Sequence, residues 1–117
     1  MDHNELKRRT KDFAHRCVKL CANLQGDYLS RHISSQLIRS ATSTAANYRA
    51  ACMGHSKAAF ISKLSIVIEE VDESSFWIEF LYEEGILSRN QVSLLLEEAN
   101  ELASIFIAAR KTLQTKK

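Results

Sequence analysis

One stretch of the sequence decides the fold class: Ile33-Ser-Ser-Gln-Leu37-Ile-Arg-Ser-Ala41-Thr-Ser-Thr44-Ala-Ala-Asn-Tyr48-Arg-Ala-Ala51. Its apolar and small residues recur at steps of three and four, the spacing of one face of an α-helix. The run from Ser40 to Ala46 consists of small residues, which would let a neighbouring helix come close. Neither glycine nor proline interrupts the stretch, and the whole chain has three glycines and no proline. The stretch therefore predicts a long helix in an all-α protein.

The three glycines divide the chain into four segments of helical length; they are Gly26, Gly54 and Gly85. Glycine just past a helix end can adopt the left-handed conformation that closes the last turn. Each glycine is followed by a serine that can cap the next helix, and we expect these caps at Ser30, Ser56 and Ser88. The expected helices span about residues 4–25, 30–53, 56–84 and 88–114.

Every segment carries an apolar stripe at helical spacing. The expected core residues, from the first helix to the fourth, are Leu6, Phe13, Cys17, Leu20, Leu24; Ile33, Leu37, Ala41, Thr44, Tyr48, Ala51; Phe60, Leu64, Val67, Val71, Ile78, Leu81; Val92, Leu95, Ala99, Leu102, Phe106 and Leu113. Short joints make successive helices antiparallel neighbours. The predicted fold is therefore all-α, an antiparallel up-down-up-down four-helix bundle that forms a single domain over residues 1–117.

Composition fits an ordinary globular domain, with 117 residues, 45% hydrophobic and 26% charged. No apolar run approaches the roughly 18 residues that a membrane-spanning helix needs. The segment from Met1 to Thr10 is charged and lacks the apolar stretch of a secretory signal. Three cysteines cannot all pair within one chain, and nothing indicates export. We expect a cytoplasmic protein without a membrane partner.

The net charge of +2 is unevenly distributed along the chain. Eleven Lys and Arg face four Asp and Glu up to Lys63, whereas ten acids face one Arg from Leu64 to Ala109. Such a split suits head-to-tail contacts between copies of the chain. The strongest binding signal is the basic part of the first helix, where we expect nucleic acid to bind Lys7, Arg8, Arg9, Lys11, Arg16 and Lys19. These cations could instead pair with acids of the fourth helix such as Glu97 and Glu101.

No group of residues with a catalytic or metal-binding pattern stands out. A di-iron site in a bundle needs Glu-x-x-His pairs, and the sequence has none. Zinc ligands could be imagined at Cys17, Cys21, Cys52 and His55, but antiparallel packing puts Cys52 about 20 Å from Cys17, far beyond zinc bond lengths. The acids Glu69, Glu70, Asp72 and Glu73 are expected to form a solvated outer face. We therefore expect no enzyme active site, no metal and no cofactor.

The third segment has more apolar surface than one core stripe needs. Its stripe centres on Val71, whereas Ile66 and Trp77 point well away from it, with Phe80 nearby. Long side chains of the bundle could cover this extra surface. Alternatively, Ile66, Trp77 and Phe80 form a subunit interface, where aromatic residues are enriched.

Over about half its length the chain resembles the bacterial four-helix bundle proteins first noticed in intervening sequences of 23S ribosomal RNA genes. The resemblance rests on the run from Gln36 to Ala51, and it continues through Ser56-Lys57, Phe60-Ile61, Lys63 to Ile66, Glu70, Glu73, Trp77 and Glu84-Gly85. It implies a four-helix bundle that assembles as a ring, a homopentamer. It also implies kinship with the accessory proteins of diversity-generating retroelements, which bind a reverse transcriptase and nucleic acid. The family has no established activity.

Three polar residues of the matching motif, Arg39, Asn47 and Glu73, are expected to have structural roles. Asn47 would either bond a neighbouring helix and fix its register or face the pore of the ring. Arg49 and Trp77 are expected subunit contacts. The function expected from the sequence is a non-enzymatic, ring-forming bundle that binds RNA or a ribonucleoprotein partner. The alternative is a protein scaffold with no role in nucleic-acid binding.

Overall fold

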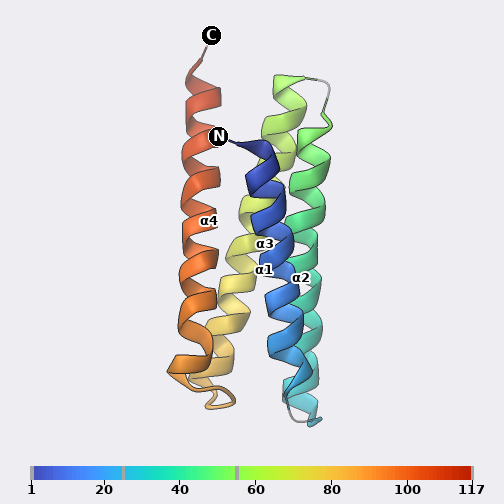
Figure 1. The fold of residues 1–117 in the computed structure, drawn as a ribbon, viewed down its shortest axis with the longest axis vertical. Helices are drawn as coiled ribbons and strands as arrows, with labels where there is room; N and C mark the ends of the chain where they lie inside the picture. The colour runs from blue at the N-terminus through green and yellow to red at the C-terminus, as the bar shows by residue number, and fades with distance from the viewer. Residues whose placement is uncertain (1, 25, 55, 117) are drawn as a thin grey trace.

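The computed structural model describes residues 2–24, 26–54 and 56–116. It contains four helices, α1 (His3–Ala22), α2 (Tyr28–Cys52), α3 (Lys57–Glu83) and α4 (Arg89–Thr115). They lie side by side along an elongated body of 50 × 20 × 20 Å, and each runs opposite to the one before it (Figure 1). The prediction of an all-α bundle of four helices is thus confirmed.

Two of the three predicted helix starts are confirmed. The Ser56 hydroxyl accepts a hydrogen bond from the Ala59 N–H at 3.0 Å, and Ser88 begins a complete capping box. The prediction was wrong for α2, because Asp27 caps this helix and its carboxylate accepts from the Ser30 N–H at 2.9 Å. A carboxylate three residues earlier is a charge-assisted acceptor, so the helix begins at Tyr28 and encloses Ser30.

The expectation that a left-handed glycine follows the end of a helix is confirmed at Gly85 and not at Gly54. Gly85 has a φ of +73°, as predicted for a residue that ends a helix in the left-handed conformation. Gly54 does not, and a Cβ there would instead lie 3.1 Å from the Ala51 carbonyl oxygen. Helix α1 ends at Ala22, earlier than predicted, and the expected end at Gln25 lies outside the described residues.

The core consists of the predicted apolar stripes. All six expected residues of α2 are buried, and so are most of those of the other helices. The exceptions are half-buried and lie near the ends of helices or, for Leu24, just beyond the end of α1: Leu20, Leu24, Phe60 and Leu113. Several buried hydroxyls bond to carbonyls of their own helix, as Thr10 does to Leu6 at 2.8 Å. These bonds satisfy polar groups that accompany the apolar core. The hydroxyl of the fully buried Tyr48 differs, because it has no hydrogen-bond partner among the described residues.

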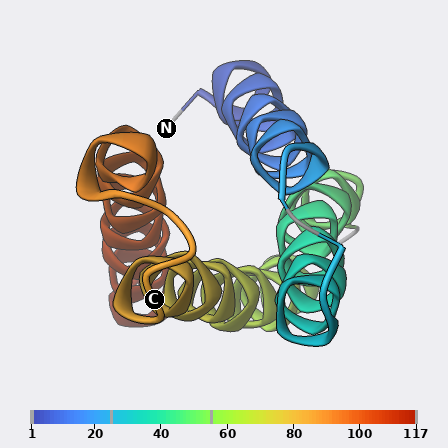
Figure 2. The same cartoon turned by 90° about the horizontal axis from the view of Figure 1, so that it is seen from below.

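Seen along the bundle, the four helices follow one another around the core in chain order (Figure 2). Contacts are most extensive between α2 and α3, where small residues meet, and least extensive between α1 and α4. Each of α1 and α4 therefore keeps a large part of its surface free of helix contacts. Within the described residues, no helix is both long enough and apolar enough to cross a membrane.

Candidate functional site

The structure separates Arg9 from the other cations of α1. Its guanidinium faces α4 and binds Glu98 through two bonds, Nη2 to Oε1 at 2.7 Å and Nε to Oε2 at 3.1 Å. Glu101 adds a contact at 3.2 Å. Hydrogen bonds from Arg9 to Glu98 raise the pKa of Arg9 above its already high value. We considered the alternative that cations of this helix pair with acids of the fourth helix, and the structure confirms it for Arg9. Of the two acids named, Glu101 is a partner, and Glu98 takes the place of Glu97.

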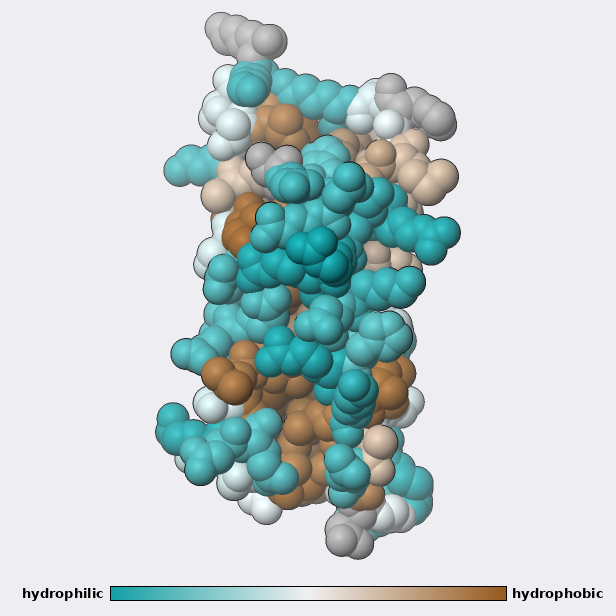
Figure 3. Space-filling model, viewed as in Figure 1, coloured by the Kyte–Doolittle hydropathy of each residue, from teal (hydrophilic) through white to brown (hydrophobic). Residues whose placement is uncertain are grey.

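Three other cations of α1 lie together on the side that faces α2. Lys7, Arg8 and Lys11 line a groove of about 620 Å³ between the two helices, and His15 of α1 and Arg49 of α2 line it as well. We call this the α1–α2 groove. Hydrophilic side chains cover the upper part of α1 in the space-filling view (Figure 3). Arg49 stays a predicted subunit contact. The structure adds that it shares the groove with cations about forty residues earlier in the chain, a proximity that the sequence does not show.

The two remaining predicted cations of α1, Arg16 and Lys19, do not line this groove. Arg16 is half-buried and Lys19 is exposed near the end of the helix. The six predicted nucleic-acid-binding residues therefore fall into three groups. One is used in an ion pair with α4, three line the groove, and two lie beyond it.

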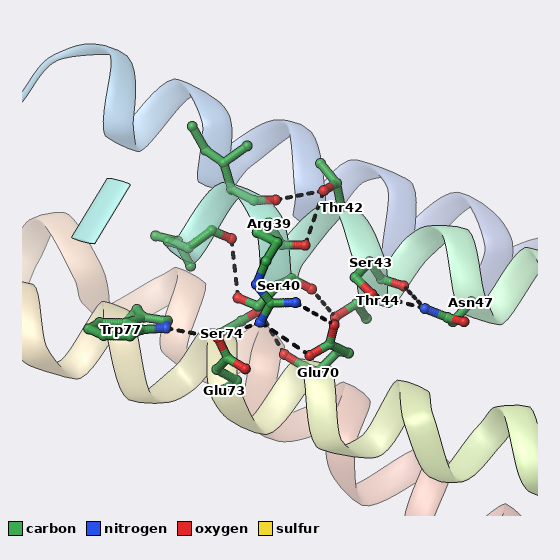
Figure 4. Close-up of polar contacts among 12 residues, drawn as sticks. Arg39, Ser40, Thr42, Ser43, Thr44, Asn47, Glu70, Glu73, Ser74 and Trp77 are labelled. Atoms are coloured by element: carbon green, nitrogen blue, oxygen red, sulfur yellow. Dashed lines mark hydrogen bonds and ion pairs between the residues drawn. The ribbon is translucent and has the colours of Figure 1, made fainter. Parts of the chain in front are cut away.

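A polar network joins α2 to α3 at the motif residues (Figure 4). The guanidinium of Arg39 donates to Glu70 at 3.0 Å and to Glu73 at 2.5 Å, and the indole N–H of Trp77 donates to the same Glu73 oxygen at 3.1 Å. The hydrogen bond from Arg39, and after it that from Trp77, lowers the pKa of Glu73. Two of the acids expected on a purely solvated face are thus bound by a cation of another helix.

A buried hydroxyl pair lies next to this network. Ser74 of α3 donates to the Ser40 oxygen of α2 at 2.9 Å, and both side chains are fully buried. Asn47 does not bond a neighbouring helix as one expectation had it. Its amide donates to the Ser43 carbonyl of its own helix at 2.9 Å. Ser40, Ser74 and Arg39 therefore join the two helices, and Asn47 bonds within α2.

The aromatic side chains of α3 form a partly exposed cluster. Trp77 and Phe80 are half-buried and pack against the core. The ring of His32 of α2 makes a T-shaped contact with Trp77, with 5.6 Å between the ring centroids. Phe76 is 52% exposed, and the centroid of its ring lies 4.9 Å from that of the Trp77 ring. Phe76 was not among the residues predicted for an interface. Its position next to Trp77, off the Val71 stripe, was the signal that could have identified it.

The described residues contain no group of three or more His, Cys, Asp or Glu side chains that could hold a metal ion. Cys17 and Cys21 are buried in α1, and burial raises the pKa of each thiol. Cys52 is half-buried near the end of α2, and His55, the fourth imagined ligand, lies outside the described residues. Both buried thiols are thus kept protonated within the core.

Comparisons with known proteins agree with this architecture. Residues 2–108 match the sequence model of a family described as 23S rRNA-intervening sequence protein. A crystal structure from Bacteroides thetaiotaomicron, of a protein of unknown function from the S23 ribosomal protein family, is similar with a TM-score of 0.85 and 32% identity. The similarity covers 95% of this chain and 99% of that one. The comparison with curated proteins gave no match.

Proposed function

Because the chain belongs to the 23S rRNA-intervening sequence protein family, we propose that it is a non-enzymatic helical bundle that assembles into a ring and binds RNA or a ribonucleoprotein partner. The ring would consist of identical copies, five by the family resemblance. RNA would bind the basic side of α1. The acidic residues between Leu64 and Ala109 would not contact the RNA, because their charge would repel its phosphates.

The observation that carries the RNA-binding proposal is the set of cations on α1 that form no ion pair with the residues that the structure describes. The ion pairs among the described residues use Arg9 and Arg39 and leave out Lys7, Arg8 and Lys11. A cation that is free of an internal partner can replace the counterions of a phosphate chain, and their release favours binding.

Self-association is supported by apolar side chains that the bundle leaves uncovered. Phe76, Ile66 and Tyr82 of α3 are 52%, 37% and 39% exposed, and Leu94 of α4 is 69% exposed. Aromatic and apolar groups of this kind are enriched in the centre of protein interfaces. The same surface favours the alternative function, a protein scaffold without a role in RNA binding.

Binding to a structured RNA and to duplex DNA at low and near-physiological salt tests the RNA-binding proposal. We expect binding whose affinity falls steeply with salt, because counterion release drives it. Absence of binding even at low salt would contradict the proposal and favour the scaffold.

The mass of the protein in solution tests the ring. We expect Phe76→Ser to lower the oligomer mass, whereas Met53→Ser should leave it unchanged, since Met53 is 71% exposed but lies outside the aromatic cluster. A monomeric wild type at micromolar concentration would contradict the ring.

A further inference from the structure

We infer that the α1–α2 groove binds the phosphate backbone of double-stranded RNA, and that Arg49 of α2 completes the site with Lys7, Arg8 and Lys11 of α1. This inference rests on the proposed RNA binding and specifies where and how the RNA is held. Cations from two different helices face one groove, and neither Asp nor Glu is among the residues that line it.

Apolar side chains between the cations make these cations more effective. Ala14 and Val18 of α1 and Ala45 and Ala46 of α2 line the groove together with Thr42. A cleft lined by charges of one sign and by walls of low dielectric constant concentrates the electric field. An anionic chain that enters the groove therefore meets a stronger attraction than it would on a flat surface with the same charges.

The spacing of the cations fits a phosphate chain. Lys7 and Lys11 are one helical turn apart, about 6 Å along α1, and Lys7 and His15 are two turns apart, about 12 Å. One strand of double-stranded DNA presents a phosphate about every 3.4 Å along the axis. At a similar spacing in a base-paired RNA, about two phosphates fit along the 6 Å between Lys7 and Lys11, and about four along the 12 Å that ends at His15. Arg8 beside Lys7 and Arg49 on the other helix bring the permanent cations that line the groove to four.

The lining also indicates which kind of nucleic acid binds. Single-stranded RNA is usually held by several aromatic side chains on which its bases stack. Among the described residues, the groove is lined by no Phe, Tyr or Trp, and its one aromatic ring is the imidazole of His15. Protein interfaces are enriched in Tyr, Trp, Phe, Met and Arg. Of these, only Arg is found among the described residues that line the groove, and Arg also suits phosphate groups. Contacts to the phosphates of a duplex need neither aromatic residues nor methionine, so the groove favours a base-paired RNA bound without sequence preference.

The experiment compares the binding of a 20-base-pair RNA duplex to variants of the full chain between about 50 and 200 mM salt. The groove variants are Arg49→Gln, which removes one cation, and Ala46→Glu, which places an acid in the groove. The matched controls are Lys63→Gln and Ala58→Glu. Lys63 is an exposed cation of α3 that does not line the groove, and Ala58 is an exposed alanine at the start of α3. Each control changes the charge by the same amount as its groove variant.

We expect the logarithm of the wild-type affinity to fall with the logarithm of salt with a slope of about −3.6 per occupied groove, for four phosphate contacts. Arg49→Gln should change this slope to about −2.7. Ala46→Glu should lower the affinity at least tenfold at low salt, and both controls should stay within twofold of wild type. The oligomer mass of each variant is measured in parallel, so that a change in assembly is not mistaken for a change in the site.

Two results would overturn the inference in distinguishable ways. If the wild type binds the duplex but the groove variants behave like their controls, the groove is not the site, and the proposed RNA binding stands without it. If the wild type binds neither the duplex nor a single-stranded RNA of the same length at low salt, both the groove site and the proposed RNA binding fail. Tighter binding to a single-stranded RNA of the same length would contradict the assignment of a duplex.

Discussion

Arg8 and Arg9 are neighbours in the sequence, yet their replacement is expected to have opposite effects. Arg9→Gln should destabilise the fold and leave RNA binding nearly unchanged. Arg8→Gln should weaken RNA binding and leave stability nearly unchanged. The reason is that the guanidinium of Arg9 binds Glu98 between α1 and α4, whereas Arg8 lines the α1–α2 groove.

The size of the Arg9 effect follows from its contacts. The two side chains of the pair are 24% and 18% exposed, and two hydrogen bonds at 2.7 and 3.1 Å hold them. Removing the guanidinium leaves the half-buried Glu98 carboxylate without its partner, and it removes a polar link where α1 and α4 make few other contacts. Bonds to charged groups that are partly shielded from water contribute about 1 to 2 kcal/mol. The Glu101 contact adds little, because that side chain is 62% exposed.

Urea unfolding and RNA binding of the same two variants test this expectation. Arg9→Gln should lower the urea midpoint by about 1 M, whereas Arg8→Gln should change the free energy of unfolding by less than about 0.5 kcal/mol. In the binding assay, Arg8→Gln should reduce the salt slope by about 0.9. All proteins are compared at one concentration, since self-association shifts apparent stability.

The opposite pattern would refute the reasoning. If Arg9→Gln weakens RNA binding as much as Arg8→Gln and leaves the urea midpoint unchanged, then Arg9 leaves Glu98 in solution and acts as a phosphate-binding cation. A loss of stability in both variants would show that Arg8 also has a partner within the fold.

Three further predictions concern the fold. Gly85→Ala should lower the free energy of unfolding by about 1 to 2 kcal/mol because the backbone there is left-handed. Gly26→Ala should leave the free energy of unfolding nearly unchanged, although at both positions a Cβ would meet no atom within 4 Å. Equal losses of stability for the two variants in urea unfolding would contradict this reasoning. Phe106→Ala should lower the free energy of unfolding by about 3 to 5 kcal/mol in the same assay, because the ring is fully buried and its centroid lies 5.0 Å from that of the Tyr48 ring. A decrease below about 1 kcal/mol would contradict this, because it would mean that the core tolerates the cavity. Arg39 lowers the pKa of Glu73, so the stability from this pair is present above the unfolded pKa of about 4.3 and is lost as the pH falls through the lower folded value. The difference in urea midpoint between wild type and Arg39→Gln should therefore shrink below about pH 4, and an equal difference at neutral and strongly acidic pH would contradict the role of Glu73.

Features that depend on neighbouring residues in the chain could be predicted from the sequence. The number of helices, the apolar stripe of each, the caps at Ser56 and Ser88 and the left-handed Gly85 are of this kind. They follow from helical periodicity and from hydrogen bonds that span a single turn. The cap of α2 was misplaced because Asp27 and Ser30 are both good capping residues, and the sequence does not say which of them the helix uses.

Features that depend on which helix a side chain faces were decided by the tertiary structure. Successive residues point about 100° apart around a helix axis, so Arg8 and Arg9 necessarily face different directions. The sequence predicts that difference in angle, but only packing places α4 with Glu98 in one direction and α2 with Arg49 in the other. The apolar stripes determine that four helices enclose one core, and the contacts among them determine which cations are paired within the fold and which remain free to bind an anion.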